Sequence, residues 1–70
     1  MQDVVLTKQP VELYKVLKFE GLADSGGQAK AVIADGLVQV NGEIETRKRR
    51  KILAGDIITF GNDKLRMRGS

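Results

Sequence analysis

The dipeptide Asn41-Gly42 predicts a tight β-hairpin in the middle of the chain. Both residue types accept the positive φ angles that a two-residue type I′ turn requires. Val38 and Val40 precede the turn with a polar residue between them, and Ile44 and Thr46 follow it. This alternation of apolar and polar side chains is typical of strands with one buried face.

Further strands are expected on both sides of this hairpin. Residues 57–60 form a short apolar stretch between two glycine-containing turns, and residues 64–68 alternate between basic and apolar side chains. Residues 4–7 near the start of the chain are apolar or β-branched. Short stretches of this composition between turn residues are typical of β-strands. The strands after residue 37 would form a meander of three or four strands.

Two short helices are expected before the hairpin. Over residues 10–20 the apolar side chains follow helical spacing, and Pro10 suits the first helical position. Gly21 suits the left-handed residue that ends a helix. Lys15 and Lys18 are three residues apart, so they would share the exposed side of this helix. With the strands, these helices predict a small α+β domain.

The second helix has a clearer start. Ser25 and Gln28 match a capping box, with Ser25 at the N-cap and Gln28 reaching back to the Ser25 N–H. Gly36 suits the end of this helix. Gly26 and Gly27 in the first turn each cost about 0.8–1 kcal/mol relative to alanine. Close helix packing and a ligand that approaches the backbone would both explain them, and the sequence leaves both open.

The composition argues against enzymatic chemistry. The sequence has no cysteine and no histidine, so thiolate nucleophiles and imidazole bases are excluded. Ser25 is expected to cap a helix rather than to act as a nucleophile, and Gly26-Gly27 lacks the Lys-Ser/Thr pair of a P-loop. We therefore expect no catalytic residue, no metal site, no cofactor and no small-molecule substrate.

A membrane or secreted protein is also not expected. No apolar stretch approaches the roughly 20 residues of a membrane span, and the apolar run near the N-terminus is too short for a signal peptide. A chain without cysteine fits a reducing compartment. The 70 residues leave room for one domain. We expect a soluble cytoplasmic protein that does not bind membranes.

The charge is unevenly distributed along the chain. Residues 1–46 hold four lysines and seven acidic residues, a balance of −3. Residues 47–70 hold eight basic and two acidic residues, a balance of +6. Such asymmetry favours an anionic partner, although a well-solvated basic segment is the simpler alternative.

Five consecutive cations, Arg47-Lys48-Arg49-Arg50-Lys51, account for most of this excess. We expect them to repel one another until an external anion neutralises them. The run follows the hairpin directly, so a folded scaffold would display it, which favours phosphate binding over a solvated loop. Arg47 and Arg49 would share one face of a strand, because side chains alternate along it. They are therefore the first candidates for phosphate contact among the five.

Lys15, Lys18 and Lys30 form a second group of candidates. Singly, each is more simply a solvated surface lysine, but a shared face favours a role in binding. The first turn of the second helix adds unpaired N–H groups at which a phosphate could bind. We expect Phe19 and Phe60 in the core and Tyr14 on the inward side of its helix. The chain would then lack a platform for stacked bases and would read nucleic acid by shape and backbone.

An ordered set of motifs resembles the RNA-binding domain of small-subunit ribosomal protein S-four, also called the alpha-L motif. The matching residues, between about Val11 and Phe60, are Leu22-Ala23-Asp24-Ser25, Gln28-Ala29-Lys30, Ile33, Gly36, Val38, Val40-Asn41-Gly42, Gly55-Asp56 and Ile58. Together with the short chain, the stretch Glu43-Ile44-Glu45-Thr46-Arg47-Lys48-Arg49 resembles the small free-standing bacterial members, the YbcJ-like group.

This resemblance implies two short antiparallel helices packed on a small, mostly antiparallel sheet of three to five strands. It also implies an RNA surface made by both helices and the neighbouring loops. By position, Lys30 matches a basic residue of the family's second helix, and Gln28 matches its polar neighbour. Gly26 and Ala31 occupy positions at which larger members often carry arginine. More of the RNA contacts are therefore expected from the basic run and fewer from the second helix.

We therefore predict a non-catalytic, monomeric RNA-binding domain over residues 1–70. It would bind structured RNA, such as ribosomal RNA or the ribosome, by phosphate contacts and shape. The predicted site residues are Lys15, Lys18, Gln28, Lys30, Arg47, Lys48, Arg49, Arg50 and Lys51. The RNA target, its sequence specificity and the biological process stay open.

Two alternatives come from other classes of protein. An adaptor could use the same basic residues to bind an acidic protein, and the sequence separates this poorly from RNA binding. A sulfur carrier or ubiquitin-like β-grasp protein shares the turn Val40-Asn41-Gly42-Glu43 and the later Gly55-Asp56 with Ile58. The ending Arg68-Gly69-Ser70 lacks the diglycine that sulfur-carrier chemistry needs, so this second alternative is the weaker one.

Overall fold

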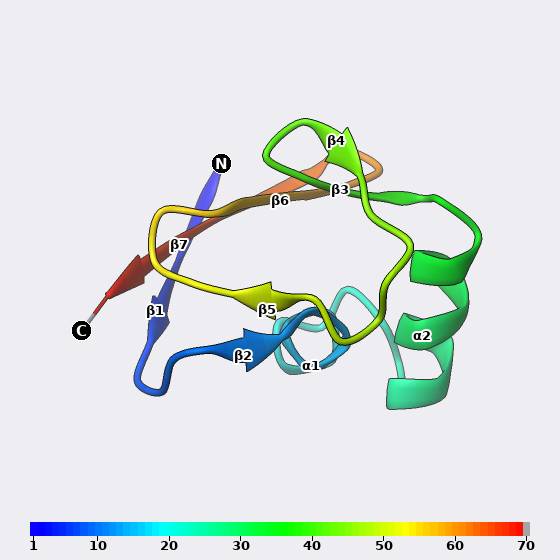
Figure 1. The fold of residues 1–70 in the computed structure, drawn as a ribbon, viewed down its shortest axis with the longest axis horizontal. Coiled ribbons are helices and arrows are strands. Elements are labelled where there is room, and N and C mark those ends of the chain that lie inside the picture. Colours follow the sequence, from blue (N-terminus) through cyan, green and yellow to red (C-terminus); the bar gives the residue numbers. More distant parts are fainter. Residues whose placement is uncertain (70) are drawn as a thin grey trace.

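The computed structural model describes residues 1–69, which form two layers (Figure 1). The elements are β1 (Gln2–Leu6), β2 (Val11–Glu12), α1 (Leu13–Phe19), α2 (Gly26–Ala34), β3 (Val38–Val40), β4 (Glu43–Ile44), β5 (Lys51–Ile52), β6 (Ile57–Phe60) and β7 (Asp63–Gly69). One layer is a five-stranded sheet in the order β1-β7-β6-β3-β4. The other holds both helices and the two-stranded ribbon β2-β5. The predicted α+β class is confirmed.

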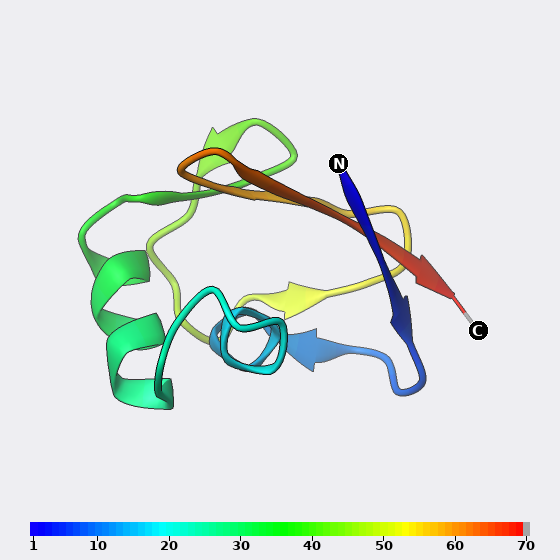
Figure 2. The same cartoon turned by 180° about the vertical axis from the view of Figure 1, so that it is seen from behind.

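The five-stranded sheet is mostly antiparallel, as predicted. Antiparallel pairs join β4 to β3, β3 to β6 and β6 to β7. β1 then adds to β7 in parallel, with Val4 opposite Met67, and so forms one edge of the sheet. Figures 1 and 2 show α1 end-on and α2 from the side, so the helices cross within their layer. Neither helix of the described residues is long and apolar enough to span a membrane.

The core lies between the two layers, and both contribute to it. Its buried side chains are Val4, Leu6, Leu13, Val16, Leu17, Ala23, Ala29, Ile33, Val38, Val40, Ile52, Ile58, Leu65 and Met67. The alternation predicted for residues 64–68 is confirmed, because β7 buries Leu65 and Met67 and exposes the basic residues between them.

The two phenylalanines have different environments. Phe60 packs against the core, as predicted. Phe19 is 68% exposed, so its prediction as a core residue is wrong. The buried face of α1 is filled by Leu13, Val16 and Leu17. Phe19 is rotated about 110° from the middle of that face at 3.6 residues per turn, so its ring points away from the core.

The first helix begins later than predicted. Pro10 lies before β2 and does not open α1, which starts at Leu13. Val11 and Glu12 instead form β2 and pair antiparallel with β5. The partner strand comes from about forty positions further along the chain, so the pairing cannot be seen in the local helical spacing.

The central hairpin has the predicted turn. Asn41 has a φ of 55° and Gly42 a φ of 84°, the positive values of a type I′ turn. Gln39 pairs with Ile44, and Val40 pairs with Glu43. β4 contains only these two partner residues, so Thr46 lies beyond the strand.

The capping box of α2 is confirmed in part. The Gln28 N–H donates to Ser25 Oγ at 3.1 Å, which satisfies one donor of the first turn. Gln28 Oε1 accepts from the Asp24 N–H at 2.6 Å and not from the Ser25 N–H that the pattern predicts. The side chain of Gln28 therefore closes the turn before α2.

Candidate nucleic-acid interface

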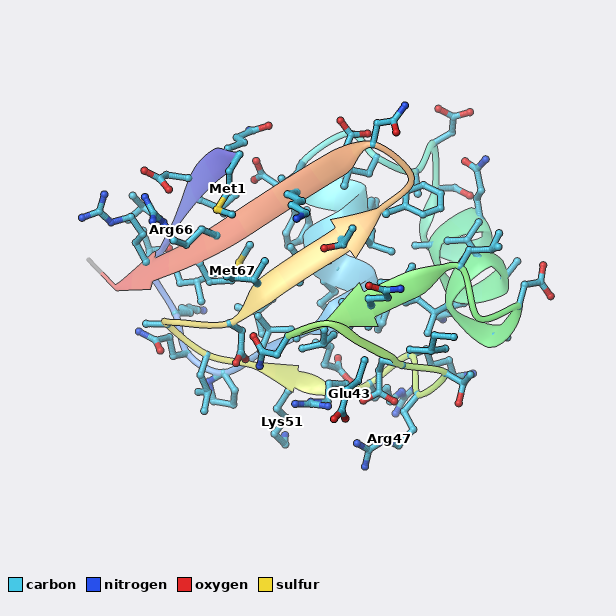
Figure 3. The ribbon with its side chains drawn as sticks, turned by 90° about the horizontal axis from the view of Figure 1, so that it is seen from above. Met1, Glu43, Arg47, Lys51, Arg66 and Met67 are labelled. Atoms are coloured by element: carbon cyan, nitrogen blue, oxygen red, sulfur yellow. The ribbon has the colours of Figure 1, made fainter. Side chains whose placement is uncertain are left out.

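The basic run folds as a loop and not as the predicted strand. Residues 45–50 connect β4 to β5 without strand pairing. The common face predicted for Arg47 and Arg49 is therefore wrong. Arg47 contacts Glu45 at 3.0 Å, whereas Arg49 Nε lies 3.7 Å from a Glu12 oxygen. Figure 3 shows Arg47 and Lys51 pointing into solvent along one edge of the molecule.

Main-chain oxygens of this loop bind the start of α1. The Leu13 N–H donates to the Arg50 oxygen at 2.9 Å, and the Tyr14 N–H donates to the Lys48 oxygen at 3.1 Å. The first N–H groups of a helix have no partner within the helix, so these bonds cap α1. They also explain why the loop leaves the sheet, because its carbonyl groups bond to a helix in place of a neighbouring strand.

Glu45 holds the first part of the loop. Its side chain is buried and accepts hydrogen bonds from the Arg47 N–H (3.0 Å), Arg47 Nε (3.1 Å), Arg47 Nη2 (3.0 Å) and Arg50 Nη1 (2.8 Å). The side-chain hydrogen bonds from Arg47 and then Arg50 lower the pKa of Glu45 to about 2, against the opposing effect of burial. An internal carboxylate thus pairs with two cations and neutralises one of their two charges, although we expected an external anion for both.

Sequence reasoning missed Glu45 as part of the site. A signal was present, because Glu45 stands between Ile44 and Thr46 directly before the basic run. An acidic residue at that position is able to pair with the cations that follow it. Glu45 follows directly after β4, whose two residues are both exposed, so alternation along the strand does not predict its burial.

Glu12 links the loop to α1 in a similar way. Its two oxygens lie 3.3 Å from Lys15 Nζ and 3.7 Å from Arg49 Nε. The Lys15 and Arg49 side chains are 45% and 69% exposed. Exposed pairs of this kind contribute only about 0–1 kcal/mol. Both cations can therefore bind an incoming anion without losing a large stabilising interaction.

The ring of Tyr14 lies next to lysines from both helices. Lys30 Nζ of α2 is 4.7 Å from the ring centroid, and Lys15 Nζ is 5.9 Å from it. A cation over an aromatic face at this distance is attracted to it. Tyr14 is half-buried against the core, so the predicted inward position is confirmed in part.

Four of the predicted residues are thus gathered around Tyr14 and Glu12. Two helices and the loop contribute them: the side chains of Lys15, Lys30 and Arg49 lie beside Tyr14 or Glu12, and Lys48 bonds to Tyr14 through its main-chain oxygen. We call these four residues the basic surface. Their positions in the sequence are up to 34 residues apart, from Lys15 to Arg49, so only the fold brings them together.

The other predicted residues lie outside this group. Lys18 is exposed one turn after Lys15 on α1. Lys51 lies on β5, opposite Glu12 in the β2-β5 pair. Arg47 and Arg50 are held by Glu45, and the side chain of Gln28 is used in the turn before α2.

The basic residues of β7 belong to a different part of the molecule. Arg66 Nε lies 2.9 Å from one oxygen of Asp3, and Arg68 Nη1 lies 3.3 Å from the other. The hydrogen bond from Arg66 is the main cause that lowers the pKa of Asp3. Figure 3 shows Arg66 beside β1 and β7, far from the edge that carries Arg47. Asp3 of β1 thus pairs with two of the three basic residues after residue 60 and neutralises one positive charge.

The two glycines of the first turn of α2 are not required by packing. A Cβ atom on Gly26 would lie 3.9 Å from the ring of Tyr14, and one on Gly27 would lie 3.8 Å from Ser25 Oγ. Both distances are ordinary van der Waals contacts. Close helix packing therefore does not explain these glycines, and a ligand at this turn stays a prediction.

Gly26→Ala is expected to stabilise the protein by about 0.5 kcal/mol, because alanine has less freedom to lose in a helix. Thermal unfolding should show a rise of about 2–4 °C for a domain of this size. Gly36→Ala is the matched control, since Gly36 has a φ of 76° that alanine adopts poorly, and it should lower the melting temperature. A drop for Gly26→Ala would contradict the space seen beside Tyr14.

Comparison with known proteins identifies the family. A family model described as "S4 domain" matches residues 4–68. The chain belongs to the S4 domain family. The YbcJ protein of Escherichia coli (strain K12) is 49% identical over 68 residues, which cover 96% of this chain and 97% of that protein. The YbcJ protein of Shigella flexneri shows the same identity and coverage.

A solved structure of the family has the same fold. The solution structure of E. coli YbcJ aligns with a TM-score of 0.74 and 46% identity, covering 97% of this chain and 87% of that one. Its alpha-L motif is described as involved in RNA binding. The predicted resemblance to the S-four-type domain and to the YbcJ-like group is confirmed, and the match extends beyond the predicted residues 11–60 at both ends.

Proposed function

We propose that this S4 domain protein binds structured RNA on the basic surface and performs no chemical step. The observation that carries the proposal is the gathering of the Lys15, Lys30 and Arg49 side chains around Tyr14 and Glu12, next to Lys48, whose main-chain oxygen accepts from the Tyr14 N–H. Membership of the family and the role described for the alpha-L motif of YbcJ support it.

The loop residues of the basic surface are held in place before any ligand binds. The main-chain oxygen of Lys48 bonds to α1, and Glu12 holds the side chain of Arg49. A binding segment that is already ordered loses less conformational entropy when its ligand arrives. The spacing of the cations from three segments is therefore set by the fold, which suits a phosphate backbone of defined shape.

Lys30 and Lys48 are the most available cations of the surface. Among residues 1–69, neither has a carboxylate within the 4 Å of an ion pair, whereas Lys15 and Arg49 share Glu12. A phosphate that approaches these two lysines competes with no carboxylate, and at Lys30 only with the ring of Tyr14. Lysine binds phosphate as a point charge, which contributes to affinity but carries no base specificity.

Recognition on the basic surface would depend on backbone and shape. The ring of Tyr14 is covered by Lys30 on one side and packs against the core, so a base has little access to it. Double-stranded regions of RNA are recognised in this way, by shape and phosphate contacts. A segment of ribosomal RNA, bound by a monomer, is the target that the resemblance to a ribosomal protein domain supports.

The test is a comparison of a folded RNA hairpin with duplex DNA of equal length, each measured over a series of salt concentrations. We expect tighter binding to RNA, with log affinity falling linearly against log salt. At about −0.7 to −0.9 per phosphate, four contacts give a slope of about −3. Absence of binding to both at low salt would contradict the proposal and favour an acidic protein partner.

A further inference from the structure

An exposed phenylalanine lies beside a groove that the basic surface does not explain. The groove has a volume of about 570 Å³ and lies between β1, β2 and α1. Phe19 of α1 and Val5 of β1 both line it, and they are 68% and 59% exposed. A groove of this volume falls within the usual range for sites that bind small ligands.

The lining of the groove is apolar with a cationic rim. Lys8, Lys15 and Lys51 line it together with the carboxylates Glu12 and Glu20. Glu12 is already paired with Lys15 and Arg49. Glu20 accepts a hydrogen bond from Gln2 Nε2 at 3.3 Å. The three lysines outnumber the two carboxylates, so the groove complements a ligand that has an apolar part and a negative charge.

The groove also continues the basic surface. Lys15 belongs to both, because it lies beside Tyr14 and also lines the groove. Lys51 follows the loop directly and lines the groove from the other side of the β2-β5 pair. A nucleic-acid strand bound by the loop and α1 can therefore reach the groove along Lys15 and Lys51, past Glu12, whose charge is paired with Lys15 and Arg49.

We propose that the groove binds one unpaired nucleotide of the RNA, with its base against Phe19 and Val5 and its phosphate at the lysine rim. The inference rests on the proposed function and adds a subsite to it. Aromatic side chains bind unpaired bases by stacking, largely without regard to sequence. Phe19 supplies a stacking platform, which was not expected while Phe19 was predicted to lie in the core.

The experiment uses three RNAs built on one hairpin whose stem is closed by a non-nucleotide linker, so that the blunt form has no unpaired nucleotide. The first has blunt ends, the second carries a three-nucleotide overhang at its 3′ or 5′ end, and the third carries the same overhang without bases. We expect an overhang at one end to raise affinity about tenfold, the size expected for one stacked base. The overhang without bases should lose most of this gain.

Phe19→Ala should abolish the gain and leave the affinity for the blunt hairpin unchanged. Leu37→Ala is the matched control, because Leu37 is 54% exposed and does not line the groove. Thermal unfolding of both variants should match the parent, since neither side chain is buried. Equal affinity for blunt and overhang RNAs, or a gain that survives Phe19→Ala, would overturn the inference while the proposed function stands. Failure of all three RNAs to bind would overturn both.

Discussion

The double variant Lys30→Glu with Lys48→Glu is expected to bind a folded RNA hairpin about 60-fold more weakly than the parent at 0.1 M salt. Each lysine–phosphate contact changes the slope of log affinity against log salt by about 0.9. At 0.1 M salt, one lost contact then lowers affinity about eightfold, and two lost contacts lower it about 60-fold. The salt slope itself should fall by about two.

Lys64→Glu is the control for net charge, because Lys64 is exposed on β7, away from the basic surface. It should change affinity far less than Lys48→Glu alone. The double variant should lose little stability, at most the attraction of Lys30 to Tyr14, which is about 0.5–1 kcal/mol for exposed pairs. Arg47 is a poorer choice for this test, since its loss also removes hydrogen bonds to Glu45. Unchanged affinity of a folded double variant would show that the site is assigned wrongly.

Glu45→Gln is expected to lower the melting temperature at pH 7 by about 5–10 °C. The arginines lower the pKa of Glu45 from 4.5 to about 2, a shift that corresponds to roughly 3 kcal/mol at 1.4 kcal/mol per unit. The Arg47 side chain is 73% exposed, and solvent screening reduces this to about 1–2 kcal/mol. In a 70-residue domain such a loss changes the melting temperature by several degrees.

The difference in melting temperature between the parent and Glu45→Gln should be smaller at low pH than at pH 7. A carboxylate whose pKa is lower in the folded state stabilises the fold above its unfolded pKa. The stabilisation is lost as protons bind, so the difference should be constant above about pH 5 and should shrink between pH 4.5 and about pH 2. Glu43→Gln, at an exposed position of β4, should match the parent throughout. A difference that stays constant down to pH 2 would exclude ionised Glu45 as its cause.

The elements that depend on neighbouring residues could be predicted from the sequence. The turn at Asn41-Gly42 follows from the φ angles that these residues accept, and the Ser25 cap follows from a three-residue spacing. The burial of Leu65 and Met67 follows from simple alternation. Each of these features is decided by contacts within a few residues, which a sequence pattern records directly.

The features that failed depend on contacts between distant segments. Pro10 suits a helix start, but the pairing of β2 with β5 occupies the residues that follow it. The face predicted for Arg47 and Arg49 assumed a strand, but carbonyl groups of the basic run bond to α1. The pairing of Glu12 with Arg49 is likewise visible only in the folded chain. The cations of the candidate site could be named from the sequence, whereas their grouping could not.

The main chain and the side chains of the loop between β4 and β5 have different roles. Oxygens of the Lys48 and Arg50 main chain cap α1, and any residue at these positions supplies the same oxygens. The Lys48 side chain is exposed and makes no ion pair within residues 1–69. We therefore expect substitution at that position to change RNA binding while the helix cap remains. Such a loop can diverge towards new ligands, or be redesigned for them, on an unchanged scaffold.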